Sequence, residues 1–257
     1  MKTPDLKGFL SKFKFEEKFK GCFGVERERF LIDGQKRLSP RAEEFLKLIR
    51  DDAWTYELSA CQVEDRTCPS RDLRDIFQNL VSNTAAGEKT AKLIDLGLKS
   101  LEVASPDMPL DVYPDERYRK IVKNISPEKL LAASRVTGTH VHVGVSSIEE
   151  AIEVYNLLRL EIDRLIKMGD HSSGLRLELY KTMALNWEPP FYRNISDFYD
   201  VALKEGFLDN PRNCWHLIRI SRHGTVECRV FGSTNLEEEI VEWVSAIKSI
   251  IGNGKFL

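Results

Sequence analysis

Four short segments of the sequence each carry two polar side chains, two positions apart, of the kinds that bind metal ions or phosphate. The pairs are Glu26 and Glu28, Gln62 and Glu64, His140 and His142, and Glu227 and Arg229. On a β-strand, residues i and i+2 point to the same face of the sheet. If the four segments share one sheet, their polar groups converge on a site that suits a hard divalent cation and the phosphates that accompany it.

Each pair, taken singly, has an ordinary structural explanation. Glu26 and Glu28 could lie on the solvated face of an antiparallel sheet. A Glu227–Arg229 ion pair at the surface would contribute little to folding stability. His140 and His142 indicate a polar pocket because glycines flank them. They lack the further Asp-His of a two-zinc hydrolase, so a zinc hydrolase is the weaker interpretation. Four similar pairs on predicted strands favour a shared site.

Arg229 could donate two hydrogen bonds to a phosphate, and a cation held by Glu227 could bind the same phosphate. Three further residues could extend this site. Arg219 and Arg222 precede this segment and could extend its cationic edge, although an arginine next to a turn often faces solvent. Glu57 could add another carboxylate, or be an ordinary surface acid. The sequence offers no persuasive Ser-His-Asp or Cys-His arrangement for nucleophilic catalysis.

The elements that must position these residues mix strands and helices without a strict βαβ alternation. We expect strands at residues 22–32, 54–58, 61–68, 101–105 and 137–145, and a hairpin of 214–221 with 225–232. Helical patterns cover residues 41–52, 71–99, 146–169, 175–183, 195–204 and 236–251. This order predicts an α+β fold with a largely antiparallel sheet.

Composition narrows the class of protein. The 257 residues, 42% hydrophobic and 30% charged, can bury a substantial core, and we expect a single domain over residues 1–257. A net charge of −2 gives no reason to expect nucleic acid or an anionic membrane as partner. The sequence has no apolar run of the roughly 20 residues that span a bilayer and no signal-peptide pattern. Five cysteines suit reduced core thiols, so we expect a cytoplasmic protein.

Several motifs together resemble a known family. GVERERFLID, ELSACQVEDRTCPSRDL, TGTHVHVGVSSIEEAIEVYNLLR and NCWHLIRISRHGTVECRVFGSTN are similar, in order and spacing, to the motifs of the type 2 glutamate-cysteine ligases, or carboxylate-amine ligases. The resemblance covers most of the chain. It implies a glutamine synthetase-like catalytic domain, in which a curved, largely antiparallel sheet with helices packed on one side holds ATP and two or three Mg²⁺ ions, with Mn²⁺ as an alternative.

The resemblance also implies roles for individual residues and a reaction. The expected metal ligands are Glu26, Glu28, Glu57, Glu64, His140 and Glu227. Arg219 and Arg229 would bind the nucleotide phosphates and take part in catalysis, and His142, a weaker ligand candidate, would contact substrate or nucleotide and is also an expected catalytic residue. Arg222 is expected among the nucleotide-binding residues because of its position beside Arg219 and not because of the resemblance. The reaction would be ATP-dependent amide formation between the side-chain carboxylate of glutamate, or another carboxylate, and an amine such as cysteine, through an acyl phosphate.

One segment departs from the family pattern and leaves alternatives open. Residues 163–184 are compressed and differently composed where relatives carry a substrate-side arginine, and either Arg176 or Lys181 could supply that cation. The substrates, and whether the chain forms a homodimer, therefore stay open. A phosphotransferase similar to guanidino kinases, or a nucleotide-binding protein of the same fold without turnover, are the alternative functions.

Overall fold

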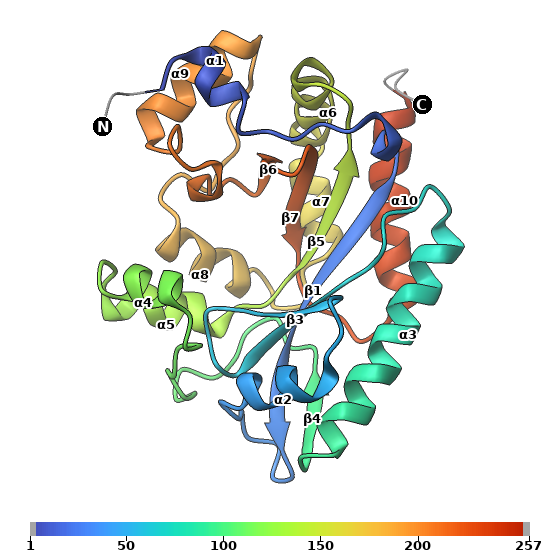
Figure 1. The fold of residues 1–257 in the computed structure, drawn as a ribbon, viewed down its shortest axis with the longest axis vertical. Helices are drawn as coiled ribbons and strands as arrows, with labels where there is room; N and C mark the ends of the chain where they lie inside the picture. The colour runs from blue at the N-terminus through green and yellow to red at the C-terminus, as the bar shows by residue number, and fades with distance from the viewer. Residues whose placement is uncertain (1–3, 254–257) are drawn as a thin grey trace.

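The computed structural model describes residues 4–253, and its strands form one seven-stranded antiparallel sheet (Figure 1). The strand order is β2-β3-β1-β5-β7-β6, and β4 pairs with the end of β1. The strands are β1 (Phe23–Asp33), β2 (Trp54–Tyr56), β3 (Gln62–Arg66), β4 (Leu96–Lys99), β5 (Thr139–Gly144), β6 (Ile218–Ser221) and β7 (Thr225–Phe231). The α+β fold with an antiparallel sheet is thereby confirmed.

Ten α-helices and two short 3₁₀ turns surround the sheet within residues 4–253. They are α1 (Leu6–Leu10), η1 (Glu17–Phe19), α2 (Ala42–Ile49), α3 (Leu73–Lys92), α4 (Glu116–Val122), α5 (Pro127–Arg135), α6 (Ile148–Leu160), α7 (Ile162–Met168), α8 (Leu175–Met183), α9 (Ile195–Glu205), η2 (Pro211–Asn213) and α10 (Glu237–Asn253). Helices α3, α6, α7 and α10 contact the strands directly. In the view of Figure 1, α6 and α7 lie behind β5 and β7, and α3 and α10 stand at the right of the sheet. None of the helices described is long and apolar enough to cross a bilayer.

The two faces of the sheet differ because side chains alternate along each strand. Val141 and Val143 of β5 point toward α6 and α10 and join a large core with Tyr155 and Trp243. His140 and His142, which alternate with these valines, point to the opposite face. One face therefore supplies the core, and the other is left for polar groups.

Three predicted elements differ from the structure. The helix expected over residues 71–99 ends at Lys92, because Asp95 adopts a left-handed φ of 55° and turns the chain into β4. The strand expected at residues 101–105 is reduced to a single bridge between Val103 and Val136. The helix expected over residues 146–169 is divided at Glu161 into α6 and α7.

Candidate metal and nucleotide site

The predicted ligand residues meet on one face of the sheet because of the strand register. Glu28 of β1 lies opposite Glu64 of β3, and Glu26 lies opposite His140 of β5. Glu227 of β7 lies opposite His142 on one side and Arg219 of β6 on the other. The structure thus brings together residues from five strands.

These side chains form the floor of a cavity of about 370 Å³. Its walls come from helices and loops, with Arg117 and Tyr118 from α4, Arg212 from η2, and Arg176 and Tyr180 from α8. Sequence patterns did not indicate Arg117, Tyr118 or Arg212, because residues in short helices and loops carry no strand-like spacing. Gln62 also borders the cavity, but its amide donates to the backbone carbonyls of Ser134 and Val136 and thereby supports α5.

Three groups of side chains in this cavity could each hold a metal ion. Within each group, one ligand atom from every member lies within 4.8 Å of the others. The groups are Glu26, His142 and Glu227; Glu26, Glu64 and His140; and Glu28, Glu57 and Glu64. Because neighbouring groups share Glu26 or Glu64, the arrangement suits a row of ions bridged by carboxylates.

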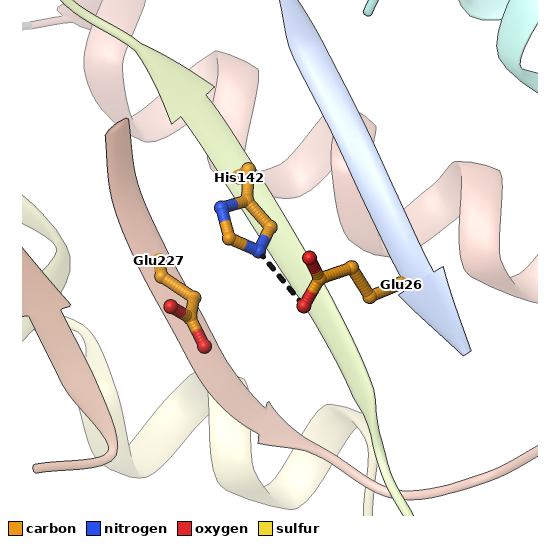
Figure 2. A group of neighbouring side chains, drawn as sticks. All are labelled: Glu26, His142 and Glu227. Carbon is orange, nitrogen blue, oxygen red and sulfur yellow. Dashed lines mark ion pairs between the residues drawn. The ribbon is translucent and has the colours of Figure 1, made fainter. Parts of the chain in front are cut away.

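The two histidines present nitrogen atoms to these groups. His142 Nδ1 lies 2.9 Å from Thr225 Oγ1, which orients the ring, and its Nε2 lies 3.2 Å from Glu26 Oε2 (Figure 2). His140 Nδ1 lies 3.5 Å from the same carboxylate oxygen. Both His142 Nε2 and His140 Nδ1 are buried and make no hydrogen bond within the described chain. Ring nitrogens that make no hydrogen bond and lie beside a carboxylate are suitable for coordinating a metal together with it.

The carboxylates on the β2–β3 side repel one another. Burial, with further contributions from the nearby Glu26, Glu57 and Glu28, raises the pKa of Glu64 well above its ordinary value. Burial likewise raises the pKa of Glu28 and Glu57. A divalent cation would offset this repulsion and stabilise the ionised forms. The donor set therefore fits Mg²⁺ or Mn²⁺.

Glu227 has a different environment, because two guanidinium groups hold it. Arg219 donates to both carboxylate oxygens, at 2.7 and 3.0 Å, and Arg229 donates to one of them. Burial alone would raise the pKa of Glu227, but Arg219 and Arg229 outweigh it and hold that pKa well below its usual range. Arg229 Nε is buried without a partner in the part of the chain described. The cationic side of the cavity thus lies beside one of the metal groups.

The remaining cations predicted from the sequence fall into different settings. Arg222 lines the cavity. Arg176 also lines it, but its guanidinium donates to the carbonyls of Thr137, Arg229 and Val230 and so ties α8 to the sheet. Lys181 pairs with Glu178 at the surface and does not border the cavity. Of the two alternatives for the substrate-side cation, only Arg176 borders the cavity. There its Nε, Nη1 and Nη2 atoms already donate to backbone carbonyl groups.

Comparisons with known proteins agree with the motifs. A model of glutamate-cysteine ligase family 2 (GCS2) matches residues 22–165. The "Putative glutamate--cysteine ligase 2" of Sorangium cellulosum (strain So ce56) is 26% identical, over 89% of this chain and 66% of that protein. The "Putative glutamate--cysteine ligase 2-1" of Rubrobacter xylanophilus is 28% identical, over 82% and 61%. The chain therefore spans just under two thirds of the length of these curated relatives.

A solved structure extends the comparison to the fold. The crystal structure of a bifunctional glutathione synthetase from Pasteurella multocida matches with a TM-score of 0.61 at 10% sequence identity. The match covers 95% of this chain and 39% of that one. At this identity the likeness concerns the arrangement of strands and helices.

Proposed function

Because this chain belongs to glutamate-cysteine ligase family 2, we propose that it is an ATP-dependent carboxylate-amine ligase. The observation that carries the proposal is the conjunction, in one cavity, of three metal-ligand groups and the Arg219–Glu227–Arg229 cluster. Such a combination favours phosphoryl transfer, because the transferred phosphoryl group needs positive charge on several sides at once. A metal-dependent hydrolase would not require the guanidinium groups.

The proposed reaction has two steps. A substrate carboxylate oxygen attacks the γ-phosphorus of ATP, a P–O bond forms, and the bond to the ADP oxygen breaks to leave an acyl phosphate. The amine nitrogen then attacks the acyl carbon, an amide forms, and inorganic phosphate leaves with a proton lost from nitrogen. Arg219 and Arg229 would hold the phosphoryl oxygens. Divalent cations at the carboxylate and histidine groups would neutralise charge on the nucleotide.

The substrates we propose are the side-chain carboxylate of glutamate and an amine such as cysteine. Support for this choice comes from the names of the relatives, at 26% and 28% identity. Arg117 and Arg212 at the cavity wall would suit a substrate with a free carboxylate. Neither step requires a nucleophilic side chain from the protein.

The decisive experiment measures ADP release from ATP with Mg²⁺ and glutamate across a panel of amines led by cysteine, with mass spectrometry of the products. Amine-dependent ADP release with the matching amide mass would support the ligase. A phosphorylated product without an amide would identify a phosphotransferase. ATP binding without ADP release for any pair would indicate a nucleotide-binding protein and contradict the proposal. The matched control is Glu64→Gln, which should abolish ADP release while the protein stays folded.

A further inference from the structure

The face of the sheet opposite the metal groups holds a buried ionic cluster directly behind them. Asp65 of β3 is fully buried, and its two carboxylate oxygens accept from two arginines of β1. Arg27 donates through Nε and Nη2 at 3.1 and 2.8 Å, and Arg29 does so at 3.1 and 2.6 Å. Both guanidinium groups are at least nine-tenths buried. One carboxylate therefore joins two cations that alternate along β1 with Glu26 and Glu28.

The cluster continues into the two helices behind the sheet. Arg27 also donates to the carbonyl of Leu80 in α3, and Asn83 of α3 donates to Asp65 at 3.0 Å. Glu237, at the start of α10, accepts from Thr84 at 2.6 Å and from Arg27 at 3.3 Å. The cluster thus connects β1, β3, α3 and α10, and two acidic groups balance its two arginines.

The sequence of β1 explains why such a cluster is useful. A strand normally takes its register from the alternation of apolar and polar side chains, and a slip by one residue exchanges its two faces. Residues 26–29 are Glu-Arg-Glu-Arg, so they are polar on both faces and lack that signal. A slip would turn the arginines toward the metal groups. Asp65 opposes it, because it lies directly opposite Arg27 in the observed register.

We propose that Asp65 is a positioning residue for the metal site. By binding Arg27 and Arg29 it fixes the register of β1 against β3, and the same register places Glu28 opposite Glu64. Buried ionic groups serve best in proteins where they specify one register among several. This inference rests on the metal groups of the proposed function and adds a residue that binds no ligand itself.

Asp65→Asn tests the inference, because it keeps the shape of the side chain and removes the charge that both arginines share. Mn²⁺ binding to the metal-free protein is measured by electron paramagnetic resonance of the free ion. We expect the affinity to fall by a factor of 10 to 100, the usual effect of losing a residue that supports metal ligands. The Mg²⁺ concentration for half-maximal ADP release should rise by a similar factor, with kcat recovered at saturating Mg²⁺.

The matched control is Phe198→Leu, which loosens the buried aromatic cluster of α1 and α9, away from β1 and β3. It should lower the melting temperature but leave Mn²⁺ affinity unchanged. If Asp65→Asn binds Mn²⁺ like the wild type, or if Phe198→Leu weakens binding equally, the positioning role is wrong. If the wild type binds no Mn²⁺, the proposed metal site fails, and the inference fails with it.

Arg27→Lys keeps the test decisive if Asp65→Asn does not fold. A lysine retains the charge but lacks the planar guanidinium group that donates to the Asp65 carboxylate and the Leu80 carbonyl together. We expect a smaller loss of Mn²⁺ affinity than in Asp65→Asn, in a folded protein. Unchanged affinity in Arg27→Lys, with a wild-type circular dichroism spectrum, would overturn the inference.

Discussion

Glu28 lies directly opposite Glu64 across the β1–β3 pair, so two carboxylates face one another at the closest spacing of an antiparallel sheet. Like charges in this position destabilise a sheet unless something lies between them. Glu57 adds a third carboxylate to the same group. The arrangement favours cation binding at the expense of the stability of the metal-free protein. Substitutions among these carboxylates and in the Arg219–Glu227–Arg229 cluster should therefore change the free energy of unfolding in different directions.

Removing the charge of Glu64 should stabilise the metal-free protein, whereas removing that of Glu227 should destabilise it. Glu64 lies directly opposite Glu28 and close to Glu57, so Glu64→Gln relieves repulsion between like charges and adds up to about 1 kcal/mol to the free energy of unfolding. Glu227→Gln leaves Arg219 and Arg229 without their shared anion and costs about 3 kcal/mol. Urea unfolding in EDTA measures both. A loss of similar size in both variants would contradict the assigned charge distribution.

Divalent cations should raise the melting temperature of the wild type. A ligand that binds only the folded state at 100 times its Kd adds about 2.7 kcal/mol to the free energy of unfolding. Differential scanning fluorimetry with Mn²⁺ titrated into EDTA-treated protein measures the shift. Glu64→Gln should lose most of it, because Glu64 belongs to two of the three groups. Ca²⁺ and K⁺ serve as controls for size and charge, and an equal shift with K⁺ would speak against coordination.

Folding stability should fall as the pH drops below about 6.5 because of His216. This ring is fully buried, with Nε2 2.8 Å from Glu205 and Nδ1 3.4 Å from Cys214 Sγ. Burial lowers the pKa of His216, although Glu205 opposes the shift. The unfolded chain therefore takes up a proton at a higher pH than the folded chain, and stability is lost below the unfolded pKa.

Urea unfolding between pH 8 and 5.5 measures this loss. The contribution of one proton has a slope of at most about 1.4 kcal/mol per pH unit. In His216→Asn the slope over this range should be smaller than in the wild type. Equal slopes in the two proteins would assign the pH dependence to other groups.

One thiol should react rapidly with Ellman's reagent at pH 8 in the native protein. Cys68 is exposed, and the other four cysteines are buried. Burial also raises the pKa of Cys61 to about 11 and those of Cys214 and Cys228 to about 12, so their reactive thiolates are scarce. All five should react in guanidinium chloride. Cys68→Ser should remove the fast phase, and a fast phase that persists would show that a buried thiol becomes accessible.

The metal side of the site was predictable from the sequence because strand geometry links spacing to direction. Glu26 and Glu28 had to share a face if residues 22–32 formed a strand, and the same argument holds for His140 and His142. The strand pairing then brings these faces together. Their roles as ligands stay predictions, whereas their convergence is a property of the fold.

Other parts of the site depend on long-range packing that leaves no local pattern. Arg176 could not be distinguished from Lys181 by sequence, because both lie on one helix and only the docking of α8 directs one of them to the cavity. Asp65 was hidden for a similar reason, since an acid between two strand residues usually faces solvent. Its burial depends on Arg27 and Arg29, which the strand pairing alone brings to it.

The site draws on residues near both ends of the described chain, and this affects how it can form during folding. Glu26 is on the first strand and Glu227 on the last, and His142 lies between them on the central strand β5. Because closing such long loops is slow, the group of these three residues is complete only after β7 has docked. Metal capture at this group would therefore report a late event in folding, and its rate could be used to time the arrival of the β6–β7 hairpin.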